Sequence, residues 1–172
     1  TVKGMAEEGN EYTGFLYAGM MVSPDGEIKV LEYNCRFGDP ETQPIMMRLK
    51  SDLVELCQAA IDGKLDTTEA EWDERAALGV VLAAGGYPEG YHKGDVITNV
   101  PQATENMKVF HAGTSLKDGE VVTNGGRVLC ATALGHSVQE AQEAAYAATK
   151  QIQWNNVYYR TDIGYRAIAR EL

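Results

Sequence analysis

Two strand-like runs joined by a tight turn constrain most strongly what this chain can fold into. Phe15–Val22 is apolar, and Glu27–Asn34 alternates between polar and apolar residues, which is the two-residue period of a β-strand. Between them stands Ser23-Pro24-Asp25-Gly26, with Pro at the second and Gly at the fourth position of a β-turn. We therefore expect an antiparallel hairpin whose return strand ends on the side of the sheet opposite the turn.

Polar side chains gather where that return strand ends. Side chains two residues apart on a strand share a face at roughly 7 Å spacing, so Glu32, Asn34 and Arg36 are expected to project together. A carboxylate beside a carboxamide oxygen suits Mg²⁺, and an Arg suits phosphate or carboxylate oxygens. These residues predict a nucleotide-metal site. The alternative is a surface ion pair between Glu32 and Arg36, with Asn34 as the polar end of the strand.

The segment after the strand predicts a turn followed by two helices. Gly38-Asp39-Pro40-Glu41 has turn residues, and Asp39 either accepts backbone N–H bonds or contacts a substrate. Pro44 favours the start of a helix that runs towards Lys50. Ser51 is the expected cap of a second helix that ends at Gly63 and packs on the sheet.

The second half predicts a separate small sheet with a covering helix. The polar composition of residues 63–76 is typical of a linker, which divides the chain into domains 1–62 and 77–172. Expected strands are Ala77–Ala84, Met107–Ser115, Glu120–Thr123 and Arg127–Leu134. Ser137-Val138-Gln139-Glu140 is a capping box for a helix that covers this mixed or antiparallel sheet. The fold class is therefore α+β.

Charge and hydropathy exclude two classes of partner. The formal net charge is −10, from 25 acidic and 15 basic residues, without a block of Lys and Arg, so nucleic acid is not expected as a partner. Apolar runs such as Leu78–Ala84 are far shorter than the roughly 20 residues of a membrane span. We expect a soluble, cytosolic protein with no membrane partner.

Cysteine and histidine give no sign of a metal site or of acyl-enzyme chemistry. Cys35, Cys57 and Cys130 lack the paired spacing of zinc ligands or disulfides and are expected to be reduced and mostly buried. The histidines are also far apart, and His111 is expected to be a core residue. Thr1 is not an initiator Met, so we expect the chain to be a processed or truncated piece of a longer protein.

Several segments together resemble one enzyme family. RFGDPETQ, preceded by LEYNC and GFLYAGMMV, resembles the signature of the phosphoribosylamine–glycine ligases, which are ATP-grasp enzymes of purine synthesis. The resemblance continues through KGMAEEG, SDLVELC, WDERAALGVVLAAGGYP, KVFHAGT and NGGRVLCATALG, and so covers nearly all 172 residues. Members of the family are more than twice as long. The resemblance thus implies the C-terminal half of an ATP-grasp domain, followed by the family's C-terminal domain.

The resemblance also implies a reaction and residue roles. ATP would phosphorylate the carboxylate of glycine, and the amine of 5-phosphoribosylamine would displace phosphate to give glycinamide ribonucleotide. Glu32 and Asn34 match the family's ligands for Mg²⁺ or Mn²⁺, Arg36 would hold phosphate oxygens, and Asp39 and Glu41 would face glycine or the ribosylamine. Many other ATP-grasp enzymes have a further acidic ligand where this chain has Gly19-Met20-Met21.

The implied partner of this chain is the missing N-terminal part of the same polypeptide, which would bring the ATP lid and the phosphoribosylamine domain. Without it, the hairpin should keep an orphaned edge and an uncovered apolar face, and the isolated chain should be inactive. The alternative is a non-catalytic binding or interaction module built on the ATP-grasp scaffold.

Overall fold

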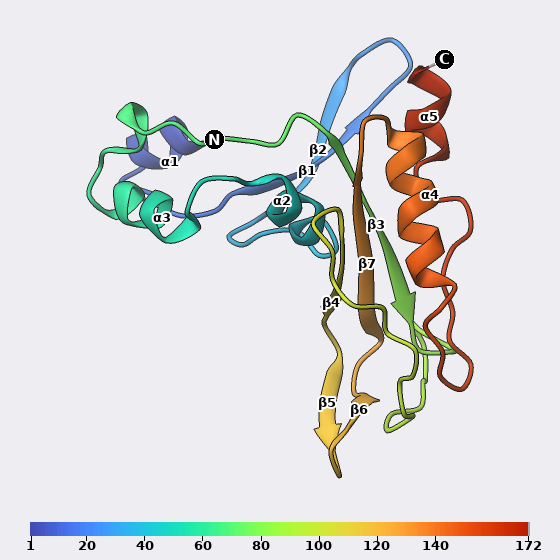
Figure 1. The fold of residues 1–172 in the computed structure, drawn as a ribbon. Coiled ribbons are helices and arrows are strands. Elements are labelled where there is room, and N and C mark those ends of the chain that lie inside the picture. Colours follow the sequence, from blue (N-terminus) through green and yellow to red (C-terminus); the bar gives the residue numbers. More distant parts are fainter. Residues whose placement is uncertain (172) are drawn as a thin grey trace. The chain divides into compact units, whose positions relative to one another are not determined.

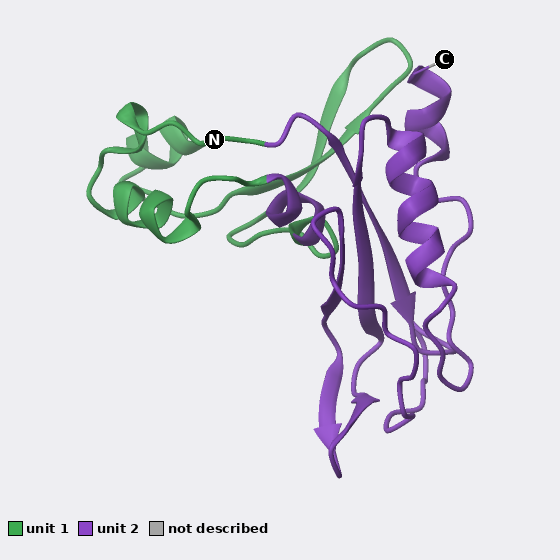
Figure 2. Ribbon diagram, viewed as in Figure 1, with its two compact units in different colours: residues 1–42, 49–72 green, residues 43–48, 73–172 purple. Residues whose placement is uncertain are grey.

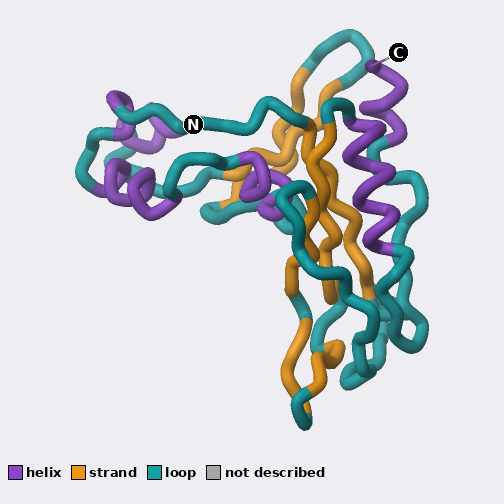
Figure 3. The backbone as a smooth tube through the Cα atoms, viewed as in Figure 1, coloured by secondary structure: helices purple, strands orange, loops and turns teal. Residues whose placement is uncertain are grey.

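The structure, a computed structural model, describes residues 1–171 and combines short helices with antiparallel strands (Figure 3). The α+β class expected from the sequence is confirmed. The chain divides into two compact units (Figure 2). Unit 1 is residues 1–42 with 49–72, and unit 2 is residues 43–48 with the chain from Asp73 onward.

The predicted hairpin forms in unit 1. Strands β1 (Tyr17–Val22) and β2 (Ile28–Asn34) pair antiparallel (Figure 1). The turn closes with a 2.9 Å hydrogen bond from the backbone N of Gly26 to the carbonyl oxygen of Ser23. Gly26 has a φ of 88°, which a residue with a side chain rarely adopts. Both strands begin later than expected, β1 by two residues and β2 by one.

The hairpin has no covered face within unit 1. No residue of either strand is buried, although several carry large apolar side chains. Leu31 is 65% exposed. The other exposed apolar residues of the two strands are Met20, Met21, Val22, Ile28, Val30 and Tyr33. The expected uncovered apolar face is therefore confirmed.

The helices of unit 1 are also uncovered. They are α1 (Val2–Glu7), α3 (Leu53–Ile61) and the short 3₁₀ turn η1 (Leu65–Thr67). No residue of α3 is buried, and Val54 and Ile61 are each 74% exposed, so the prediction that this helix packs on the sheet is wrong. An apolar stripe shows which side of a helix can be buried, but not what covers it.

Two details of the helix boundaries differ from the prediction. The cap of α3 is Asp52, whose side chain accepts a 2.7 Å hydrogen bond from the backbone N of Val54. The hydroxyl of Ser51 accepts from the backbone N of Glu71 instead. Helix α2 (Thr42–Arg48) begins two residues before Pro44, which is possible because N–H groups in the first turn have no intrahelical partner.

Unit 2 is built on a three-stranded antiparallel sheet in the order β3-β7-β4. The strands are β3 (Ala76–Ala83), β4 (Met107–His111) and β7 (Arg127–Gly135), and a separate hairpin joins β5 (Thr114–Lys117) to β6 (Glu120–Thr123). The single strand predicted over 107–115 is thus two strands. The break falls where the backbones of Gly113 and Gly125 meet, since a Cβ on Gly113 would lie 2.6 Å from the Cα of Gly125.

Helix α4 (Val138–Thr149) covers one face of this sheet, as predicted (Figure 1). Its cap is Ser137, whose hydroxyl accepts from the backbone N of Glu140 at 3.1 Å. The carboxylate of Glu140 bonds the backbone N of His136, one residue before the expected capping-box partner. The small residues Ala141 and Ala145 are fully buried against the strands, which lets the helix lie close to the sheet.

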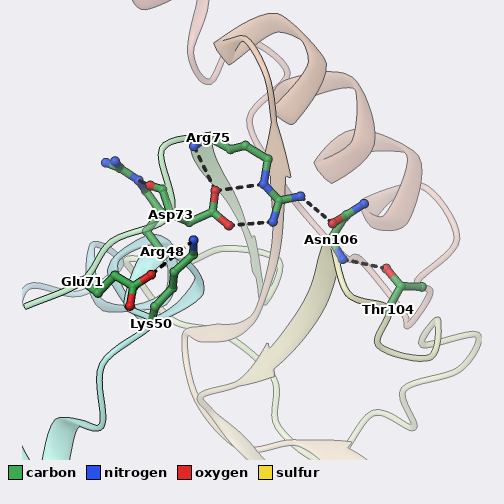
Figure 4. Close-up of polar contacts among 7 residues, drawn as sticks. All are labelled: Arg48, Lys50, Glu71, Asp73, Arg75, Thr104 and Asn106. Carbon is green, nitrogen blue, oxygen red and sulfur yellow. Dashed lines mark hydrogen bonds and ion pairs between the residues drawn. The ribbon is translucent and has the colours of Figure 1, made fainter.

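The chain at the start of β3 is fixed by a polar cluster in unit 2 (Figure 4). Arg75 binds the carboxylate of Asp73 through two nitrogens, at 2.9 and 2.7 Å, and donates to the side-chain oxygen of Asn106 at 2.7 Å. The Nε of Arg48 donates to the carbonyl oxygen of Asp73. This cluster ties the entry of β3 to α2 and to the segment before β4. The C-terminal helix α5 (Tyr165–Glu171) follows in the same unit.

The expectations for cysteine and histidine need correction. Cys130 is buried and Cys57 is half-buried, but Cys35 is exposed, and no disulfide joins them. His111 is exposed and lies 3.1 Å from the hydroxyl of Thr114, so it is not a core residue. Across residues 1–171, no helix has the length and apolar character needed to cross a membrane.

Candidate functional site

The polar residues predicted from the sequence lie at the open end of the hairpin in unit 1 and in the loop that follows it. In the strand register, Tyr17 pairs with Asn34 and Gly19 pairs with Glu32. A β-bulge interrupts the register next to Gly19, on the turn side of these pairs. Because the bulge lies before Glu32, Glu32 and Asn34 keep the regular two-residue spacing and share one face of β2.

Gly19 leaves room beside Glu32. A Cβ on Gly19 would come within 3.2 Å of the Cγ of Glu32, so a side chain at this position would crowd the carboxylate. The neighbouring residues of β1 are Met20 and Met21, which offer no carboxylate. On these adjoining strand ends, the acidic oxygen donors come from β2 alone.

Asn34 has an unsatisfied polar atom. Its side-chain Nδ2 is shielded from solvent and has no hydrogen-bond partner among the described residues. Leaving a buried amide N–H without a partner costs roughly 1–3 kcal/mol, so this group is expected to meet an acceptor outside the described residues. The carboxamide of Asn34 and the carboxylate of Glu32 together present oxygen donors of the kind that Mg²⁺ prefers.

Arg36 lies beyond the end of the strand, although its side chain was expected to project from the same face as Glu32 and Asn34. Strand β2 ends at Asn34, and Arg36 stands in the bend that follows, where its Nη1 donates to the carbonyl oxygen of Phe37 at 2.9 Å. Alternation along β2 therefore does not set the direction of its side chain. Arg36 nonetheless lies close enough to the hydroxyl of Tyr17 to influence the pKa of that tyrosine.

The loop that carries Asp39 and Glu41 is closed at its base. The backbone N and the hydroxyl of Thr42 both donate to the carbonyl oxygen of Gly38, at 3.1 and 2.5 Å. Asp39 and Glu41 are exposed within this closed loop, and the Asp39–Pro40 peptide bond is cis. The loop has a defined base, and its acidic side chains remain accessible to a ligand.

Tyr17 is the site residue that the sequence did not reveal. Its hydroxyl donates to Oε1 of Glu41 at 3.3 Å. The Glu41 carboxylate, partial desolvation and the Glu32 carboxylate raise the pKa of Tyr17, and Arg36 opposes them. The hydroxyl therefore stays protonated at neutral pH and acts as a donor. Three of the predicted residues, Glu32 on β2, Arg36 in the bend after it and Glu41 in the loop, thus act on one phenol.

The donor set fits a metal that takes most of its ligands from elsewhere. Within residues 1–171, no three His, Cys, Asp or Glu side chains come together to form a metal site. Mg²⁺ is often bound by one or two protein side chains, with water and phosphate oxygens completing its shell. Glu32 and Asn34 suit that limited role through their side-chain oxygens, whereas the unpartnered Nδ2 of Asn34 is a hydrogen-bond donor and suits an acceptor oxygen.

Comparison with known proteins identifies two domain families in the chain. The model "Phosphoribosylglycinamide synthetase, C domain" matches residues 77–166, and "Phosphoribosylglycinamide synthetase, ATP-grasp (A) domain" matches residues 1–42. The chain is 70% identical to a phosphoribosylamine–glycine ligase of Vibrio vulnificus (strain CMCP6) and 66% identical to that of Escherichia coli O157:H7. In each case 99% of this chain is covered, and it spans 40% of the relative's length.

Solved structures give the same result. A crystal structure of phosphoribosylamine–glycine ligase from Thermotoga maritima is 40% identical, with a TM-score of 0.79 over 93% of this chain and 39% of that one. The biotin carboxylase domain of Hydrogenobacter thermophilus 2-oxoglutarate carboxylase has a TM-score of 0.62 over 91% of this chain and 35% of that one. Its identity is 16%, so this second likeness concerns the fold alone.

Proposed function

The chain belongs to the phosphoribosylglycinamide synthetase family and corresponds to the C-terminal portion of its members, and we propose that it supplies part of the active site of an ATP-dependent ligase. The reaction joins glycine to 5-phosphoribosylamine through a glycyl phosphate, with release of ADP and phosphate. Residues 1–62 carry the metal-binding part of the ATP-grasp domain, residues 63–76 form the linker, and residues 77–172 form the C-terminal domain. The protein acts in the cytoplasm.

One observation supports this proposal most strongly: the hydroxyl of Tyr17, at the open end of a hairpin, binds Glu41 at 3.3 Å and also feels the charges of Glu32 and Arg36. Acidic and basic groups that surround one exposed strand end are suited to a ligand with both phosphate and amine groups. The same residues stand within the segment that matches the ATP-grasp family model, residues 1–42.

In this ligase the protein's contribution is positioning and charge neutralisation. Glu32 and Asn34 would hold Mg²⁺, or Mn²⁺, through their side-chain oxygens. When bound, the metal ion neutralises charge on the phosphates of ATP. The guanidinium of Arg36 binds phosphoryl oxygens as a planar fork, a geometry that a point charge does not reproduce.

The acidic loop is assigned to the amine-bearing substrates. Asp39 and Glu41 are exposed on a loop whose base is closed by Thr42, and the Glu41 carboxylate is bound by Tyr17 of β1. A carboxylate there accepts hydrogen bonds from the amine of glycine or of 5-phosphoribosylamine. The opposite charges of Arg36 and Glu41 then orient the reactants. The phosphoryl group lies towards Arg36, and the amine lies towards Glu41.

The test is ADP release that depends on both glycine and 5-phosphoribosylamine. The 172-residue chain alone should release none, and activity should appear when the N-terminal portion of the ligase is added. Turnover by the chain alone would contradict the proposal that the site is shared. Absence of turnover in the mixture and in the full-length protein would favour a non-catalytic module.

Substitutions in the full-length ligase test the residue roles. Glu32→Gln should lower kcat at least about 100-fold at saturating Mg²⁺ with little change in melting temperature, because a metal ligand loses its charge. Glu27→Gln is the matched control, since Glu27 sits at the turn and forms an exposed ion pair with Lys29 at 3.6 Å. Arg36→Lys should also cause a large loss. Near-normal turnover in Glu32→Gln would remove Glu32 from the site.

A further inference from the structure

We propose that Tyr17 is a positioning residue of this ligase, which holds the carboxylate of Glu41 in place to receive the amine of a substrate. The inference rests on the proposed function and adds a residue from β1 to the groups on β2 and the loop. Tyr17 does not touch the reacting atoms in this account. It acts through Glu41.

The contact joins a rigid donor to a flexible acceptor. The hydroxyl of Tyr17 donates to Oε1 of Glu41 at 3.3 Å. Tyr17 stands on β1 in register with Asn34, so strand pairing fixes its backbone, and its ring has two rotatable bonds. Glu41 is exposed on a loop, and a glutamate side chain loses considerable rotational freedom when it is held in one position. A fixed phenol can therefore select one orientation of the carboxylate.

Gly38 allows this contact to form. Gly38 is buried, and a Cβ at that position would lie 2.7 Å from the Tyr17 ring atom Cε2 and would also collide with the Glu41 carboxylate. The backbone of the loop therefore lies directly against both members of the pair. Any larger residue at 38 would separate the phenol from the carboxylate.

The surrounding charges favour a neutral donor at this position. The carboxylates of Glu41 and Glu32 both act on the hydroxyl of Tyr17, and the guanidinium of Arg36 acts on it in the opposite direction. A cationic side chain at position 17 would bind either carboxylate and would repel Arg36. The phenol instead donates one hydrogen bond to Glu41 and leaves the charges of Glu32 and Arg36 available for their own ligands.

Steady-state kinetics of the full-length ligase test the role through Glu41. Tyr17→Phe removes only the hydroxyl, and we expect kcat/KM for one amine substrate to fall about 10-fold, the scale of a hydrogen bond to a charged group. The KM for ATP and the melting temperature should not change. Measuring glycine and 5-phosphoribosylamine separately identifies which amine Glu41 receives.

The double variant separates positioning from a general structural effect. In a Glu41→Gln background, Tyr17→Phe should cause less than a 2-fold further loss, because the group it positions has already been altered. Tyr33→Phe is the matched control: its hydroxyl lies on the neighbouring strand and accepts a 2.7 Å hydrogen bond from Thr1. That variant should retain wild-type kinetics.

Three kinds of result overturn the inference in distinguishable ways. If wild-type ligase is active and Tyr17→Phe matches it, or if the loss persists in the Glu41→Gln background, Tyr17 does not position Glu41. If the KM for ATP rises as much as that for the amine substrate, the hydroxyl supports the site in general and not Glu41. If wild-type ligase forms no product, the proposed function fails, and the positioning role fails with it.

Discussion

Units 1 and 2 use the same kinds of residues in opposite ways. Every buried apolar residue of the described chain belongs to unit 2, between Leu78 and Trp154. Unit 1 has strands and helices with apolar side chains, but none of those side chains is buried. The candidate functional residues all lie in unit 1. Stability and chemistry are therefore carried by different parts of the chain.

This contrast shows what the candidate site needs. A two-stranded hairpin alone is marginally stable in water, because it buries too little apolar surface to offset the entropy of ordering its backbone. The hairpin of unit 1 holds Glu32 and Asn34, and its apolar residues remain exposed. Under the proposed function, the remaining length of the ligase covers these residues and orders the site.

The largest expected effect compares two leucines on strands. Leu82→Ala should lower the free energy of unfolding by about 2–5 kcal/mol, because Leu82 is fully buried in the core of unit 2. Leu31→Ala, at a residue that is 65% exposed in unit 1, should change it by less than about 0.5 kcal/mol. The measurement is urea unfolding followed by tryptophan fluorescence in a Trp72→Phe background, which leaves the core residue Trp154 as the reporter. Equal losses of unfolding free energy in the two variants would contradict the contrast between the units.

Two glycines give the next largest difference. Gly126→Ala should cost about 1–3 kcal/mol, since its Cβ would overlap the ring of Tyr87 in unit 2. Gly4→Ala, in helix α1 of unit 1, meets nothing within 4 Å and should leave the same transition unchanged. The same urea titration measures both variants. A stable Gly126→Ala protein would show that the Tyr87 ring moves aside easily.

The helix caps should give a smaller difference. Ser137→Ala removes the cap of α4, which packs on the sheet of unit 2, and should cost about 1 kcal/mol. Asp52→Ala removes the cap of α3, none of whose residues is buried, so the unfolding of unit 2 should be unaffected. Thermal melts followed through Trp154 fluorescence would check both. A similar loss from Asp52→Ala would mean that α3 contributes to the cooperative fold.

The smallest expected effect concerns acid stability. A hydrogen bond from Arg160 lowers the pKa of Asp162 in unit 2, so this carboxylate stabilises the fold above its unfolded pKa, and the contribution is lost as the pH falls. The pair is exposed, so Asp162→Asn should only slightly reduce the acid dependence of stability. Asp25, whose pKa is lowered by a hydrogen bond from Ser23, lies in the turn of the exposed hairpin. Asp25→Asn should not alter the pH dependence of the unfolding of unit 2, as reported by Trp154. A change would contradict the separation of stability in unit 2 from the hairpin of unit 1.

The sequence predicted those elements that depend on local chemistry. The Ser23–Gly26 turn determined the hairpin, and the capping box at Ser137 determined the start of α4. The sequence did not predict which apolar faces are covered by another element. The apolar stripe of α3 is the same whether or not a partner lies on it. Ser51 and Asp52 are both good capping residues, and only the structure shows that Asp52 caps α3 by accepting a hydrogen bond from the backbone N of Val54.

Tyr17 was missed because of one irregularity in register. Counting back from the turn, Val22 pairs with Ile28 and Met20 with Val30, and an unbroken ladder would place Tyr17 opposite Tyr33. The bulge beside Gly19 moves the pairing by one residue and brings Tyr17 opposite Asn34. The sequence carries a signal of this bulge. Val30 and Leu31 are adjacent apolar residues, so the alternation of polar and apolar residues shifts by one position there.

Amide hydrogen exchange tests the central claim most directly, namely that unit 2 is stable by itself whereas the site in unit 1 is ordered by the rest of the ligase. In the 172-residue chain, amides of β1 and β2 should exchange rapidly, and those of β3 and β7 should be protected up to the global stability. In the full-length ligase, both pairs of strands should be protected. Equal protection of the hairpin and of β7 in the chain alone would contradict this account.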